Sequence, residues 1–243
     1  MIILKKDDKS HKISALETMY PSFMFRFSNN NKIDLPSFQW STLFGYAADS
    51  TDIFLSQKLA PYHIEAGNFF SIPLKNNQIT KIDSNQMYGI FRLGFNGQMS
   101  QGEVEEKGRL TYIDGCSDSI LAYPPRKGDA SLNYLYFPPN VDQSFHTHPS
   151  IRMGVVIGGS GLASTHEVQK PTWNGSLSLK ASSVAKQVDK PLDVGDIFVL
   201  EENELHRFRT QSEEMRIIAY HPETDFGPTD DNHAMINRTY LKK

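Results

Sequence analysis

The most informative stretch of the chain is Phe145-His146-Thr147-His148-Pro149-Ser150. It follows Tyr134–Phe137, which reads YLYF and is an aromatic-rich strand candidate. In an extended segment, residues i and i+2 point to the same side. His146 and His148 would therefore project together, as two imidazoles do when they hold one metal ion. The alternative is that they are ordinary strand histidines with satisfied hydrogen bonds.

The rest of the chain consists mainly of short apolar runs bounded by Gly, Pro, Asn and Asp. Helical periodicity is scarce, and only residues 10–20 are a candidate for a short helix. A turn is expected at Gly158–Gly161, after a short apolar run. Many short strands separated by turns are typical of a β-sandwich or β-barrel. The further strand candidates are Phe23–Phe27, Val155–Ile157, Ile197–Leu200 and Met215–Tyr220.

Two segments of the sequence echo each other. Ile64–Pro73 can be laid over Leu192–Glu201, with a glycine, then Asn or Asp, then Phe at matching offsets. This echo indicates a duplicated domain, although two unrelated turn-plus-strand segments would also explain it. Residues 96–108 are polar, charged and rich in glycine, as in a linker. We therefore predict two lobes, residues 1–100 and residues 101–243.

The C-terminal half resembles the two signatures of the cupin superfamily. The first, G-x5-H-x-H-x3-4-E-x6-G, reads Asn140-x5-His146-x-His148-x3-Arg152-x6-Gly159. The second, G-x5-P-x-G-x2-H-x3-N, reads Gly195-x5-Glu201-x-Asn203-x2-His206-x3-Thr210. The resemblance covers Tyr134–Tyr220 and is faint in the N-terminal half.

The resemblance implies an all-β, double-stranded β-helix, the jelly-roll barrel of cupins, in two tandem lobes with few short helices. It also implies that His146, His148 and His206 meet around one divalent metal ion. Imidazole ligands suit Fe, Zn and Ni, and tolerate Mn. The N-terminal lobe has no HxH pair, and Gln78 stands at the position that matches His206. We expect that lobe to be a degenerate cupin without metal.

One departure from the cupin pattern concerns the glutamate ligand, whose place Arg152 takes. A guanidinium stays protonated and cannot ligate a metal. Gln143, Glu204 or another carboxylate is a candidate to complete the site. Arg152 itself is either a clamp for a substrate carboxylate or phosphate, or half of a structural ion pair.

Five other residues are candidates for chemistry. Asp114 and Asp118 fit turn caps or, alternatively, a catalytic carboxylate. Cys116 is expected to be a buried apolar thiol, since a nucleophile would need a basic partner. The polar tail after residue 220 is expected to wrap the barrel. It offers His233 as an acid–base residue, with His221 as an alternative, or else it is a dimer arm or a surface loop.

Bulk properties narrow the classes of function. The net charge is −3 and no basic stripe is present, so neither nucleic acid nor a membrane surface is an expected partner. The apolar part of Met1–Ser10 is too short for the core of a signal peptide. Cys116 is the single cysteine, which rules out an internal disulfide and favours a reducing cytoplasm.

Three classes of function remain open. The first is a metal-dependent enzyme on a small polar or anionic substrate, foremost an iron-dependent dioxygenase. Thiol dioxygenases of the superfamily also lack the glutamate and hold a carboxylate with an arginine. A redox-inert metal would instead support isomerase, lyase or hydrolase chemistry. The second class is a non-catalytic barrel that binds a small molecule. The third is a dimer scaffold with Trp40 and Phe44 at the contact; a homodimer is expected in any case.

Overall fold

The structure is a computed structural model that describes residues 1–28, 38–56, 60–76, 78–168 and 185–233. Within these ranges it contains antiparallel strands, one 3-10 turn at Ile113–Gly115 and no α-helix. The all-β class predicted from the sequence is confirmed. The described residues accordingly include no helix long and apolar enough to cross a membrane.

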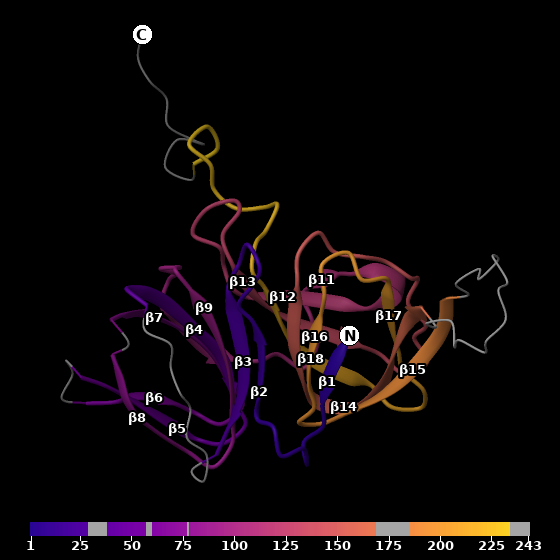
Figure 1. The fold of residues 1–243 in the computed structure, drawn as a ribbon, viewed down its shortest axis with the longest axis horizontal. Coiled ribbons are helices and arrows are strands. Elements are labelled where there is room, and N and C mark those ends of the chain that lie inside the picture. Colours follow the sequence, from indigo (N-terminus) through magenta and orange to yellow (C-terminus); the bar gives the residue numbers. More distant parts are fainter. Residues whose placement is uncertain (29–37, 57–59, 77, 169–184, 234–243) are drawn as a thin grey trace, which may run out of the picture.

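The first lobe consists of two sheets built from the N-terminal half (Figure 1). Its six-stranded sheet has the order β10-β7-β4-β9-β3-β2, and its three-stranded sheet has the order β6-β5-β8. The strands are β2 (Lys12–Ala15), β3 (Ser22–Phe27), β4 (Trp40–Ala47), β5 (Thr51–Leu55), β6 (Tyr62–Ile64), β7 (Asn68–Lys75), β8 (Ile79–Ser84), β9 (Met87–Leu93) and β10 (Ser100–Glu103).

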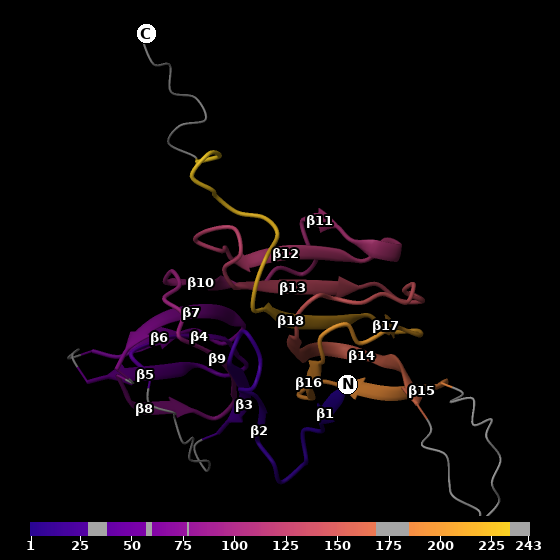
Figure 2. The same cartoon turned by 45° about the horizontal axis from the view of Figure 1, so that its top comes forward.

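The second lobe is a nine-stranded sheet that curls into a barrel beside the first (Figures 1 and 2). Its main order is β1-β16-β14-β18-β13-β12-β11, and β15 and β17 also pair with β14. The strands are β1 (Ile2–Leu4), β11 (Leu110–Thr111), β12 (Ser117–Ala122), β13 (Ser131–Phe137), β14 (Arg152–Val168), β15 (Ala185–Asp193), β16 (Ile197–Leu200), β17 (His206–Arg209) and β18 (Met215–His221).

The two lobes repeat one arrangement of strands. β7-β4-β9-β3 of the first sheet follow the same order as β16-β14-β18-β13 of the second. The echoing segments form the same turn in both, with φ +86° at Gly67 and +93° at Gly195. The Gly67 N–H donates to Ala47 O, and the Gly195 N–H donates to Val156 O. The sequence echo therefore marks equivalent turn-and-strand segments.

Strand pairing crosses the predicted lobe boundary at both ends. β1, from the start of the chain, pairs with β16 of the second sheet, while β10 pairs with β7 of the first. Arg26 holds the segment after β1 in place, since its Nη1 donates to Lys5 O and Gly195 O. The division at residue 100 stays a prediction, with Ile2–Leu4 placed in the second sheet by its pairing.

An apolar core joins the lobes. Met24 and Phe44 from the first lobe pack in one cluster with Tyr134 and Tyr220 from the second. Phe44 is only 1% exposed, and its ring centroid lies 5.5 Å from that of Tyr220. The suggestion that Phe44 is an exposed dimer contact is therefore wrong, because it faces the other lobe. Trp40 is 37% exposed.

The first lobe has an apolar core of its own, which includes Phe23, Phe25, Phe70 and Phe91. The rings of Phe23 and Phe91 stack at 4.9 Å between centroids. Aromatic side chains thus occupy the space between its two sheets.

Two local predictions are wrong. Residues 10–20 hold no helix, because Lys12–Ala15 forms β2 and pairs with β3. The expected turn at Gly158–Gly161 is absent, because β14 runs through it from Arg152 to Val168. The pairing of β14 with β18 shifts register between Val156 and Gly158. Glycines are common at such β-bulges, which accounts for their presence within the strand. At Gly159, φ is +65° and a Cβ atom would lie 1.8 Å from the backbone oxygen of Glu214, so only glycine fits there.

Candidate metal centre

Three histidines converge inside the second lobe. His146 and His148 lie in the segment before β14, and His206 begins β17. His146 and His206 form an isolated antiparallel bridge with two backbone hydrogen bonds of 3.0 Å. One ring nitrogen from each of the three residues lies within 4.8 Å of the others. This spacing suits one metal ion, and the structure brings together all three ligands expected from the sequence.

Backbone carbonyls set the tautomers of two of these histidines. The Nδ1 of His146 lies 2.9 Å from Ser144 O, and the Nδ1 of His206 lies 2.8 Å from Glu204 O. A carbonyl only accepts, so each Nδ1 carries the proton and each Nε2 presents its lone pair. The Nε2 of His206 is buried and has no hydrogen-bond partner among the described residues. Second contacts of this kind orient histidine ligands in metal sites, so the residues fit a metal.

Burial keeps the imidazoles neutral. Desolvation lowers the pKa of His148 to about 3, and the positive charge of Arg152 adds to the effect. Desolvation likewise lowers the pKa of His206 to about 4, and His146 contributes in the same direction. Metal ions bind the neutral form of imidazole. Both residues are therefore in the metal-binding form at neutral pH.

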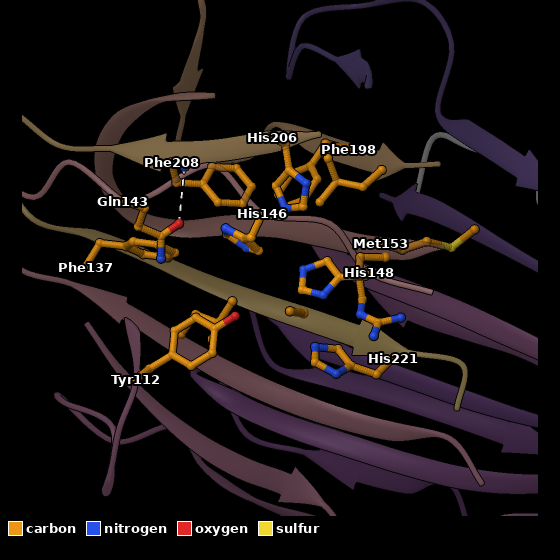
Figure 3. Close-up of a pocket in the computed structure, with 14 residues that line it drawn as sticks. Tyr112, Phe137, Gln143, His146, His148, Met153, Phe198, His206, Phe208 and His221 are labelled. Atoms are coloured by element: carbon orange, nitrogen blue, oxygen red, sulfur yellow. Dashed lines mark hydrogen bonds between the residues drawn. The ribbon is translucent and has the colours of Figure 1, made fainter. Parts of the chain in front are cut away.

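The three histidines open onto a cavity of about 30 Å³. A single ordered water needs at least ~10–15 Å³, so the cavity suits a ligand of few atoms. Figure 3 shows Tyr112 and Gln143 toward one end of the site, and His148 and His221 toward the other. The lining residues are otherwise mostly apolar and comprise Leu135, Phe137, Met153, Phe198, Leu200, Phe208 and Ala219, with Arg152 and the other two histidines.

Arg152 is a buried cation on the cavity wall. It is 9% exposed, and its Nη1 donates to Ser150 O, Ser150 Oγ and Ile151 O. Its Nε is buried without a hydrogen-bond partner among the described residues, and the carboxylates that act on it do so only as charges, without a hydrogen bond. Glu223 and Asp225 act on its pKa only as more distant charges, in opposition to the lowering by burial. The described residues therefore provide no structural ion pair for Arg152.

Neither of the two named candidates for a fourth ligand presents a free oxygen. The Glu204 carboxylate pairs with the Met1 ammonium and accepts from the Glu201 N–H at 3.0 Å. The Oε1 of Gln143 accepts from the Phe208 N–H at 3.2 Å. The candidate ligand set within the described residues is thus the three histidines.

The two histidines considered as acid–base residues, His221 and His233, lie in different surroundings. His233 is exposed and is not one of the lining residues, whereas His221 lines the cavity with its ring 6.4 Å from that of His148. Burial lowers the pKa of His221 well below its usual value. Tyr112, which sequence reasoning missed, directs its hydroxyl into the cavity (Figure 3). In the sequence, the only feature that could have indicated Tyr112 is its position just before the Asp114-Gly115 turn.

The contacts of Asp114, Cys116 and Asp118 fit structural roles. Asp114 lies at φ +53° and accepts the Ser144 N–H at 2.6 Å, which ties this turn to the segment before His146. Cys116 is 2% exposed, and desolvation raises its pKa to about 11, as expected for a buried thiol. Desolvation raises the pKa of Asp118 to about 6, and its carboxylate accepts from Asn133 Nδ2.

Solved structures share this fold. Neither protein-family models nor curated protein sequences match the chain. A cupin 2 conserved barrel domain protein from Leptotrichia buccalis is 13% identical, with a TM-score of 0.52, and the match covers 91% of this chain and 89% of that one. Protein Ylba from E. coli is 12% identical, with a TM-score of 0.57, over 93% and 92%. The chain therefore has the cupin fold, and at these identities the likeness concerns the fold.

Proposed function

We propose that the chain is a metal-dependent oxidoreductase of the dioxygenase type that acts on a small carboxylate. One observation carries the proposal: a buried guanidinium without a carboxylate partner lines the same small cavity as three converging imidazoles. A buried charge needs a compensating partner, and the planar guanidinium matches a carboxylate through two parallel hydrogen bonds. A substrate carboxylate is the partner that this geometry calls for.

His146, His148 and His206 would hold the metal, and Arg152 would hold the substrate carboxylate. Arg152 lies close enough to His148 to lower its pKa, so a carboxylate bound there would sit beside the metal ligands. A bound iron ion would supply the redox chemistry with O2. The apolar lining would exclude water from the reacting atoms. His221 and Tyr112 are the lining residues suited to accept or donate a proton.

Three neutral ligands are compatible with this class of reaction. The histidines would bring no negative charge to a bound metal and would leave room for substrate and O2. The cavity of about 30 Å³ limits the substrate to a short acid. A homodimer and a cytoplasmic location belong to the same proposal and await direct measurement.

A second candidate is a redox-inert metal enzyme, such as an isomerase, lyase or hydrolase. The observation that favours it is the presence of two proton-handling side chains, Tyr112 and His221, in one cavity with the histidine triad. Three imidazoles also suit zinc and nickel. A non-catalytic barrel that binds a small acid would need only Arg152.

The experiment is an O2-uptake screen of iron-reconstituted protein with short carboxylic acids. The proposal predicts substrate-dependent O2 uptake that is lost in Arg152→Met, while the iron content stays near one per chain. Uptake that is the same in Arg152→Met would contradict the role of Arg152. Turnover of an acid with zinc but without O2 would favour the second candidate.

A further inference from the structure

The end of the cavity at Gln143 and Tyr112 has its own polar groups. Gln143 is 1% exposed and lines the cavity between Phe137 and Phe208 (Figure 3). Tyr112 directs its hydroxyl into the same space. Arg152 neighbours the other end, since its charge acts on His148 and His221. The metal ligands lie between these two sets of polar groups.

The orientation of the Gln143 amide follows from its hydrogen bonds. Its backbone N–H donates to Phe208 O at 3.2 Å, and its Oε1 accepts from the Phe208 N–H at 3.2 Å. A backbone N–H can only donate, so the amide oxygen must face Phe208, and the reverse assignment of O and N is excluded. Nε2 therefore points away from Phe208.

The Nε2 atom of Gln143 carries two hydrogens but has one hydrogen-bond acceptor among the described residues. It lies 3.4 Å from Cys116 Sγ, a weak acceptor that takes one N–H. The second N–H has no acceptor among the described residues, although the side chain is almost fully buried. An unfulfilled buried donor on a cavity wall favours a ligand that carries an acceptor.

We infer that Gln143 is a specificity-determining residue that donates a hydrogen bond to a second oxygen of the substrate. Tyr112 supplies another polar contact at the same end. The substrate class is then a short acid with a carboxylate at the Arg152 end and an oxo or hydroxyl oxygen at the Gln143 end. This inference rests on the proposed function and deepens it. It also replaces the idea of Gln143 as a fourth metal ligand, because the amide oxygen already accepts from the Phe208 N–H.

The test compares two acids of matched shape, pyruvate and isobutyrate, which differ by an oxygen in place of a methyl group. Calorimetry with zinc-reconstituted full-length protein gives the affinity for each acid. The preference for pyruvate should fall by about 5- to 15-fold in Gln143→Leu, the loss expected for one buried hydrogen bond. Any chelation of zinc by pyruvate is common to all variants and cancels from this comparison.

Three further variants show whether the loss of preference is specific to the Gln143 donor. Gln143→Met has a side chain of similar length without a donor or a charge, so it should lose the preference even if Gln143→Leu folds poorly. Leu135→Met changes another lining side chain without removing a donor and should keep the preference. Arg152→Met should weaken both acids by a similar factor.

Retention of the wild-type preference in both Gln143 variants, with zinc still near one per chain, would overturn the inference and leave the proposed function intact. Failure of both acids to bind the wild-type protein would contradict the proposed function, and with it this inference.

Discussion

The buried histidines make the metal-free protein sensitive to acid. His148 and His206 have pKa values of about 3 and about 4 in the folded protein, against about 6.5 in an unfolded chain. Between these values the unfolded state binds more protons, so the free energy of unfolding falls as the pH drops below about 6.5. Burial also lowers the pKa of His221 and acts in the same direction.

The magnitude follows from the pKa shifts. Between pH 7 and pH 5, linkage gives about 2 kcal/mol for each of His148 and His206, or about 4 kcal/mol together. Asp118 opposes this by about 1 kcal/mol, because its pKa is raised to about 6 and its folded form gains a proton in the same window. Partial solvent contact of His148 screens the effect further. From His148, His206 and Asp118 we expect a net loss of about 2 kcal/mol, to which His221 adds.

The assay is urea unfolding of chelator-treated protein at pH 7, 6 and 5, followed by circular dichroism and extrapolated to water. The matched control is the double variant His148→Gln with His206→Gln, whose neutral side chains cannot take up the protons. Its unfolding free energy should fall less than that of the wild type in this window, because only His221 still takes up a proton on unfolding and Asp118 opposes that effect. An equal loss in the wild type and the double variant would refute the reasoning.

Three other outcomes are expected. Arg152→Met should weaken the binding of short carboxylates at least ~10-fold, the usual cost of a charged hydrogen-bonded contact, as measured by calorimetry against Arg152→Lys, which should retain part of the affinity. Gly154→Ala should lower the unfolding free energy by about 1–3 kcal/mol, because the new Cβ would lie 2.4 Å from Phe198 Cζ; an unchanged urea midpoint would show that the ring moves aside freely. The Cys116 thiol should react with a thiol reagent at pH 8 only after unfolding, since it is 2% exposed and its pKa is about 11; rapid labelling of the folded protein would contradict this.

Much of the fold was predictable because its strands carry local patterns. Phe23–Phe27, Ile197–Leu200 and Met215–Tyr220 are apolar and β-branched or aromatic, and each lies within an observed strand. The glycines of β14 do not mark a turn, because glycine permits a bulge or a close approach as readily as it permits a turn. The pairing of Ile2–Leu4 with β16 joins segments almost 200 residues apart, and no local pattern indicates such a contact.

The site was predictable to the extent that it lay in a motif. His146 and His148 are two residues apart on an extended segment, and His206 stands at a recognised spacing after Gly195. Tyr112 follows β11 and His221 ends β18, so both reach the cavity only once the barrel closes. His221 and His233 were equivalent in the sequence, and tertiary structure distinguishes them.

The central claim is that His146, His148 and His206 hold one metal ion in a cupin barrel. The most direct test is elemental analysis of protein purified without chelator and after reconstitution, beside the double variant His146→Ala with His148→Ala. The account predicts about one metal ion per wild-type chain and none in the variant, with unchanged circular dichroism. A wild-type protein that retains no metal after reconstitution, or a variant that retains as much as the wild type, would contradict it.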